Sequence, residues 1–159
     1  MSNVTHAGAS APVAVRDVVD VRGPRFAAWV TTAVLVAALL ASTQSLLAAA
    51  LILGVQAVVF GVGATLGPRR HPYGRVFAAL IAPRLSPTTE REPVAPVKFA
   101  QGVGFVFAVV GTVGFAVGLT PVGLVATGFA LVAALLNAAF GICLGCQLYP
   151  LFTRLTPTR

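Results

Sequence analysis

The sequence predicts an all-α integral membrane protein with four transmembrane helices. Of its 159 residues, 57% are hydrophobic and only 9% are charged, whereas charged residues make up about 25% of an ordinary soluble domain. The mean hydropathy is +0.91. The apolar residues fall in four long runs, and none of these runs alternates apolar with polar residues as a transmembrane β-strand does. We therefore expect helices rather than a membrane barrel.

Each apolar run approaches or reaches the length of a membrane-spanning helix, which is about 20 residues for a hydrocarbon core of about 30 Å. The predicted helices cover about residues 26–43, 46–66, 99–119 and 122–146. Short uncharged turns follow the first and third helices, and Pro121 suits the first turn of the fourth helix. These turns predict two antiparallel hairpins, joined by a loop over residues 67–98.

The distribution of charge predicts the orientation of the helices. All eleven Lys and Arg residues and all four acidic residues fall in residues 16–25, 69–98 and 154–159. By the positive-inside rule, these segments and therefore both termini are cytoplasmic. We expect a multi-pass protein of the inner (plasma) membrane, with a disordered N-terminal tail over residues 1–17 and a C-terminal tail over residues 153–159. Anionic lipid headgroups account for the net charge of +7, so we expect no nucleic-acid partner.

Smaller features refine this arrangement. In the loop, residues 68–84 are expected to lie along the membrane surface, and residues 85–98 are expected to form an extended strap. Glycines four residues apart let helix backbones approach closely in lipid; such pairs are Gly63/Gly67, Gly114/Gly118 and Gly141/Gly145. Amide side chains at membrane depth are expected to hydrogen-bond to neighbouring helices; these are Gln56, Gln101 and Asn137.

The two cysteines of the chain are the best candidate for a chemical site. Cys143 and Cys146 form a Cys-Leu-Gly-Cys motif near the end of the fourth predicted helix. At 1.5 Å per residue, Cys143 lies about 32 Å from Val122, at the cytoplasmic edge of the hydrocarbon. In a reducing compartment, functional cysteine thiols are usually catalytic, redox-sensing or metal-binding.

This placement puts the cysteines at a helix C-terminus, where the helix dipole opposes a thiolate. Activation of the thiols then requires nearby cations, and the loop offers Arg69, Arg70, His71 and Arg75. Two alternatives remain open. The cysteines can be packing residues, or Cys143, Cys146 and His71 can bind zinc or cuprous copper, although no fourth ligand is evident. Apart from that weak metal site, we expect no metal and no cofactor.

Several motifs together resemble a bacterial membrane-protein family catalogued as domain of unknown function 4395. They are Asp20-Val-Arg-Gly-Pro-Arg-Phe, His71-Pro-Tyr-Gly-Arg-Val-Phe, Pro83-Arg, and Asn137-Ala-Ala-Phe-Gly-Ile-Cys-Leu-Gly-Cys-Gln-Leu-Tyr. The resemblance covers about residues 18–152 and implies a small four-helix membrane protein. Genes of this family often neighbour thioredoxin-like or sulfurtransferase genes. The resemblance therefore implies thiol or sulfur chemistry near the membrane, with such a protein as the partner.

Two functions are consistent with these features. The first is a thiol–disulfide or sulfur relay at the cytoplasmic membrane face, with a thioredoxin-like partner. Cys146, nearer to water, would then be the attacking thiol and Cys143 the resolving one. The second is a non-catalytic scaffold or anchor that holds cytoplasmic partners against the membrane through the arginine-rich loop. The sequence alone does not decide whether the protein is an enzyme.

Overall fold

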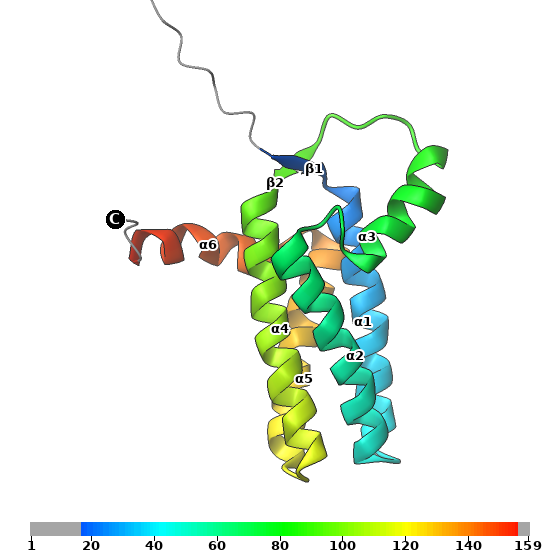
Figure 1. The fold of residues 1–159 in the computed structure, drawn as a ribbon, viewed down its shortest axis with the longest axis vertical. Helices are drawn as coiled ribbons and strands as arrows, with labels where there is room; N and C mark the ends of the chain where they lie inside the picture. The colour runs from blue at the N-terminus through cyan, green and yellow to red at the C-terminus, as the bar shows by residue number, and fades with distance from the viewer. Residues whose placement is uncertain (1–16, 156–159) are drawn as a thin grey trace, which may run out of the picture.

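The computed structural model describes residues 17–155, in which four long helices pack side by side (Figure 1). All four are long and apolar enough to cross a membrane. This finding confirms a mainly helical fold with four candidate spans. The helices are α1 (Arg22–Ser42), α2 (Leu46–Leu66), α4 (Val94–Ala116) and α5 (Thr120–Leu135), the last continued by a π-helical turn, Leu136–Phe140.

Helix α2 has the predicted bounds, but α1 and α4 begin earlier than the apolar runs do. They start at Arg22 and Val94 rather than at residues 26 and 99. Each has a proline in its first turn, where the missing N–H has no intrahelical partner to lose. Arg22 and Arg25 in α1, and Pro96 and Lys98 in α4, interrupt the apolar pattern, which explains the difference.

The core of the bundle consists mainly of small side chains. Leu35, Leu53 and Phe115 are at most 1% exposed, and the other residues of this cluster are Ala38, Ala49, Ala50 and Ala130. The most extensive contact joins α2 and α4, while α1 packs against α2 and α5. Alanine-rich interfaces allow the close helix packing that is typical of membrane proteins.

The three predicted glycine pairs each combine two different roles. Gly63, Gly114 and Gly145 lie where a Cβ atom would come within 3.0 Å of another part of the chain, as predicted for packing glycines. Their partners Gly67, Gly118 and Gly141 instead have positive φ angles, of 86°, 78° and 69°. Glycine adopts this conformation without strain, so these residues end helices. Gly67 and Gly118 therefore have no close packing contact, whereas Gly141 both turns the chain and lies against Arg25.

The segment before α1 and the end of the loop form a small β-ribbon. Strand β1 (Val18–Asp20) pairs antiparallel with β2 (Arg91–Pro93), with Val19 opposite Glu92. The Asp20 carboxylate accepts hydrogen bonds from Arg22, whose guanidinium also donates to the Ser86 carbonyl. The predicted strap is thus extended only in part, because residues from Val94 onward belong to α4.

A further helical segment connects α2 to the ribbon. It consists of α3 (Pro72–Val76), a π turn (Phe77–Ile81) and a short 3₁₀ turn (Ala82–Arg84). In Figure 1 this segment, the β-ribbon and the last helix, α6, all gather at the same end of the bundle. That end carries the thiol site.

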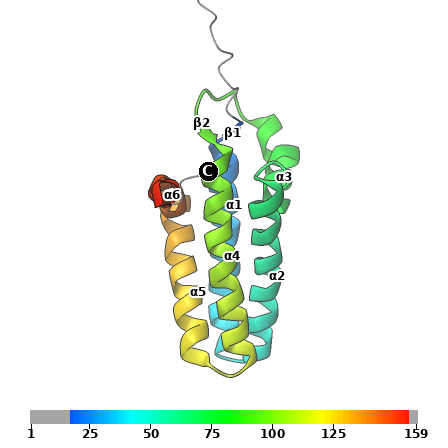
Figure 2. The same ribbon diagram turned by 60° about the vertical axis from the view of Figure 1, so that its left-hand side comes forward.

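The fourth predicted helix is not continuous to residue 146, as the sequence suggested. The chain turns at Gly141, and a separate helix α6 (Leu144–Leu155) runs across the bundle axis (Figures 1 and 2). Residues 153–155, expected in a C-terminal tail, belong to α6. The predicted disordered tail over residues 1–17 lies, apart from Asp17, outside the described residues.

Candidate thiol site

The turn at Gly141 creates the N-terminus on which the cysteines lie. The Gly141 N–H donates to the Asn137 carbonyl at 3.1 Å, and the Ile142 N–H donates to the Leu136 carbonyl at 3.2 Å. These bonds satisfy the last carbonyls of the π turn, much as a Schellman motif does. A Cβ atom at Gly141 would also collide with the guanidinium of Arg25. Glycine is therefore required by both its φ angle and its neighbour.

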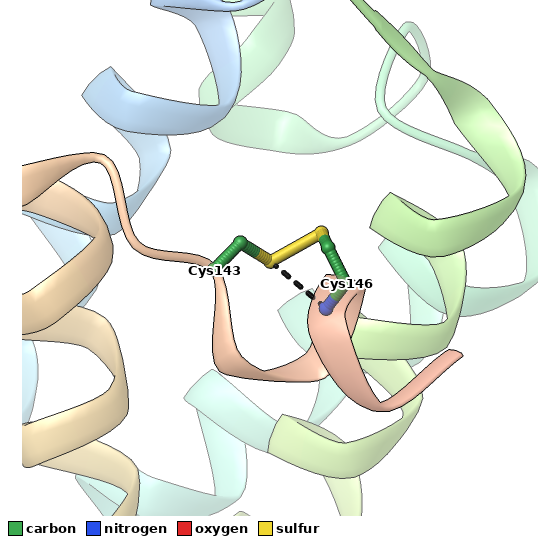
Figure 3. The surroundings of a disulfide bond; sticks show 2 residues. All are labelled: Cys143 and Cys146. Carbon is green, nitrogen blue, oxygen red and sulfur yellow. Dashed lines mark hydrogen bonds between the residues drawn. A yellow bond between two sulfur atoms is a disulfide. The ribbon is translucent and has the colours of Figure 1, made fainter. Parts of the chain in front are cut away.

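Cys143 occupies the N-cap position of α6. Its carbonyl accepts the first intrahelical hydrogen bond, from the Gln147 N–H at 3.1 Å. Its Sγ accepts a hydrogen bond from the Cys146 N–H at 3.3 Å (Figure 3). This is the bond that a Ser or Asp oxygen makes in an ordinary N-cap. The sulfur of Cys143 thus lies at the positive end of the helix dipole.

Cys143 and Cys146 are joined by a disulfide bond, with their Cα atoms 5.2 Å apart. That separation is ordinary for a disulfide. Both residues are partly exposed. The expectation that the pair lies at a helix C-terminus is wrong, because the break at Gly141 puts it at a helix N-terminus instead. A dipole that was expected to oppose a thiolate at this motif therefore stabilises one at Cys143.

The first turn of α6 packs tightly on α4. A Cβ atom at Gly145 would lie 2.6 Å from both Cα and Cβ of Ala100. Further along, the ring of Phe99 contacts Tyr149 and Phe152, at centroid distances of 5.8 and 5.2 Å. The glycine inside the Cys-Leu-Gly-Cys motif is thus needed for the approach of the two helices, which holds the disulfide against the bundle.

The cation next to this site is not one that the sequence indicated. Arg25, on α1, lies against Gly141 and also acts electrostatically on Glu92. Arg69, by contrast, forms an ion pair with Asp17 at 2.8 Å and donates to the Val18 carbonyl. A charge just before the first apolar run was the available signal for Arg25, but nothing in the sequence linked α1 to the turn at Gly141.

His71 does not join the cysteines. It is 2% exposed, packs edge-on against Tyr73 at a centroid distance of 5.2 Å, and lies against Gly63. The Gln101 amide faces the imidazole, but neither ring nitrogen makes a well-aligned hydrogen bond to a described residue. Burial lowers the His71 pKa to about 4, an effect that Gln101 opposes. His71 is therefore a neutral, buried side chain at neutral pH.

The suggested metal site of Cys143, Cys146 and His71 is not formed. Within residues 17–155, no three His, Cys, Asp or Glu side chains come together as metal ligands would. The cysteines share a disulfide, and His71 faces a different cavity, which Asp20, Arg69 and Arg91 also line. The three residues do not come together because the cysteines lie at the start of α6, which packs on α4, whereas His71 lies at the start of α3.

The amide side chains behave differently from one another. Gln56 is fully buried, donates to Thr31 Oγ1 at 3.4 Å and accepts from the Tyr73 hydroxyl at 2.8 Å, which confirms the predicted bond to a neighbouring helix. The Oε1 atom of Gln101 is buried without a hydrogen-bond partner among the described residues. Gln101 and Asn137 both line a cavity that extends to the disulfide.

This second cavity, of about 250 Å³, lies behind the disulfide and is walled by α1, α2, α4, α5 and the start of α6. Cys143 lines it, whereas most of the wall is apolar and includes Phe60, Phe107 and Phe129. Glu92 lines it too, and burial raises the pKa of this carboxyl group while Arg25 lowers it. The site therefore combines a disulfide, a few polar groups and an apolar chamber.

Fold and site together define a class: a small, mainly helical protein with four candidate membrane spans and a Cys-x-x-Cys disulfide at the N-terminus of a helix that crosses the bundle. The chain belongs to the family described as Domain of unknown function (DUF4395), whose model matches residues 19–154. This match confirms the family resemblance. No curated protein and no solved structure matches the chain.

Proposed function

We propose that this protein is a thiol–disulfide relay of the plasma membrane that works with a thioredoxin-like partner on the cytoplasmic side. The observation that carries the proposal is the position of Cys143 as N-cap of α6, with its sulfur accepting the Cys146 N–H. Cys-x-x-Cys motifs at helix N-termini favour the thiolate, which is the reactive form in disulfide exchange. The family resemblance, which implies thiol or sulfur chemistry near the membrane, agrees with such a partner.

The membrane orientation rests on the ends of the bundle. Charged side chains lie on the β-ribbon, on α3 and the connection before it, on α6, and on the nearby ends of α1 and α4, which gather at one end (Figure 1). The turns at the opposite end carry no charge. By the positive-inside rule, the charged end and both termini face the cytoplasm, with the four long helices as two antiparallel hairpins across the plasma membrane. Exposed apolar side chains, such as Leu51, Val58 and Val125, would then face lipid.

This orientation can be tested with reporter fusions. A reporter that is active only in the cytoplasm should work when inserted at residue 88, in the loop, and fail when inserted at residue 44. The reverse pattern would place the disulfide outside the cytoplasm and exclude a cytoplasmic partner.

In the relay, we assign Cys143 as the thiol that forms the mixed disulfide and Cys146 as the resolving thiol. This reverses the roles expected from the sequence, because the N-cap hydrogen bond and the dipole both stabilise negative charge on Cys143. The Cys143 thiolate attacks a disulfide sulfur of the partner, and the partner's other sulfur leaves as a thiolate. Cys146 then attacks Cys143, releasing the reduced partner and restoring the disulfide. Electrons can pass in the opposite direction through the same intermediate.

Partner capture tests this assignment. With Cys146→Ser, the protein has no thiol of its own to resolve the mixed disulfide, so we expect a covalent complex with a thioredoxin-like protein to accumulate on a non-reducing gel and to be lost on adding reductant. With Cys143→Ser, the complex should be at least tenfold weaker. Absence of any such complex from both variants, in cells and with purified thioredoxin, would contradict the relay.

The same variants address the scaffold alternative. In a scaffold, the cysteines serve only packing, so replacing both with Ser should leave the capture of cytoplasmic partners unchanged. In a relay, the double variant should lose every covalent complex and should behave in cells like a deletion of the gene.

A further inference from the structure

The cavity behind the disulfide has no role in the exchange steps of the proposed relay. Cys143 lines it, and the chain contains no third cysteine. A relay with only one cysteine pair cannot pass electrons to a second pair of its own. To turn over with a dithiol partner, it must deliver the electrons to an external acceptor, and the cavity is the place where an acceptor would meet Cys143.

The wall of the cavity indicates the chemical class of that acceptor. Three aromatic rings and several alanines surround a space of about 250 Å³, which is slightly smaller than a typical ligand pocket of about 300–1,000 Å³. Such a space accommodates one flat ring system but not a large polar cofactor. The small residues that open it, on α1, α4 and α5, are Ala28, Ala100, Gly104, Ala130, Ala133 and Ala134.

The polar groups are few and suit a carbonyl-bearing ring. Gln101 and Asn137 each carry an amide that can donate a hydrogen bond to a carbonyl oxygen. The Oε1 atom of Gln101 is directed toward His71, so the amide nitrogens of Gln101 and Asn137 are the groups that can bond to the ring.

The route into the cavity is apolar. Phe129 on α5 and Leu148 on α6 line the cavity and are 60% and 50% exposed. The edge of the cavity between these two residues is therefore open and apolar. A ligand that enters by this route would come from the bilayer rather than from water.

We infer that the cavity binds the ring of a membrane quinone, which accepts the electrons of the Cys143–Cys146 dithiol. This inference rests on the proposed relay. In the step, the two S–H bonds break and one S–S bond forms, so the dithiol loses two electrons and two protons. The quinone gains both, and its two carbonyls become the two hydroxyls of a quinol. The partner's dithiol then reduces the disulfide again and completes the cycle.

The test uses the reduced full-length protein in detergent with duroquinone, whose fully substituted ring resists addition of thiols. We expect loss of two thiols per protein and formation of one quinol. Ala133→Phe should slow this oxidation at least tenfold by filling the cavity. Val132→Phe, one position along α5 and 55% exposed, should leave the rate unchanged. Circular dichroism and the total thiol count establish that each variant is folded, and Asn137→Leu provides a second cavity variant.

The outcomes separate the quinone site from the relay. Wild-type protein that exchanges with thioredoxin but is not oxidised by duroquinone would overturn the quinone site and leave the relay intact. Equal oxidation rates in wild type and both cavity variants would also overturn it, as would a lipid acyl chain that occupies the cavity and is not displaced by duroquinone. Oxidation by duroquinone without exchange with thioredoxin would support the quinone site and contradict the relay.

Discussion

The backbone N–H of Cys146 donates a hydrogen bond to the sulfur of Cys143, at 3.3 Å. This contact makes one cysteine the N-cap of the helix that carries the other. The two cysteines are therefore chemically unequal, although they are only three residues apart and belong to the same disulfide. The predictions below concern the features that produce this inequality and hold it in place.

The first prediction concerns Gly141, whose φ angle of 69° turns the chain between α5 and α6. Gly141→Ala should destabilise the protein by about 1–2 kcal/mol from the left-handed conformation alone, with a further cost from the contact with Arg25. Gly128→Ala is the matched control, because a Cβ atom there meets nothing within 4 Å. Thermal unfolding in detergent measures both, and equal melting temperatures would contradict the required turn.

The second prediction concerns the packing of α6 on α4. Gly145→Ala should push the first turn of α6 away from Ala100 and cost about 1–3 kcal/mol, as overpacking does. Gly102→Ala, in α4 itself, is expected to be nearly neutral because the nearest neighbour of its Cβ atom would be 4.0 Å away. Unfolding by denaturant compares the two. If Gly145→Ala is as stable as Gly102→Ala, α6 does not pack as described.

The third prediction concerns the buried link between Tyr73 and Gln56. Tyr73→Phe removes the hydroxyl that donates to Gln56 Oε1 and leaves a fully buried acceptor unpaired, at a cost of about 1–3 kcal/mol. Tyr149→Phe keeps the ring contact with Phe99 and should change stability little. A melting temperature unchanged by Tyr73→Phe would show that the bond contributes nothing net.

The fourth prediction is a pH dependence from His71, whose pKa falls from 6.5 to about 4 on folding because of burial. Between these values the unfolded chain binds more protons than the folded one, so stability falls as the pH drops from about 6.5 to about 4. The loss from this group amounts to about 3 kcal/mol and does not grow further below pH 4.

His71→Phe preserves an aromatic ring next to Tyr73 but cannot titrate. Its stability should fall less than that of the wild type between pH 7 and pH 4.5, while Glu92 and the other carboxyl groups titrate in both proteins. Parallel pH profiles for the two proteins would show that His71 is not buried in its neutral form.

Much of the bundle follows from hydropathy, because the free energy of burying apolar residues in lipid acts over whole helices. Helix α2 was predicted to the residue. What hydropathy cannot detect is a change of backbone direction inside an apolar run. Gly141 lies among apolar residues, so the run looked continuous to residue 146, yet its positive φ ends one helix and starts another.

The candidate site depended on that single turn. The sequence identified Cys143 and Cys146 but placed them at the wrong end of a helix, and it offered His71 and Arg69 as neighbours instead of Arg25. Contacts between α1 and the turn at Gly141 are tertiary, with no pattern along the chain to signal them. The cavity was missed for the same reason, since its wall combines residues from five helices and the β-ribbon.

The central claim is that the N-terminus of α6 makes Cys143 the reactive thiol. The most direct measurement is competitive alkylation of the fully reduced protein at pH 6.5 with less than one equivalent of iodoacetamide, followed by peptide mass spectrometry. Because only the thiolate reacts, Cys143 should be alkylated at least fivefold faster than Cys146. Equal labelling of the two residues, or faster labelling of Cys146, would contradict the account.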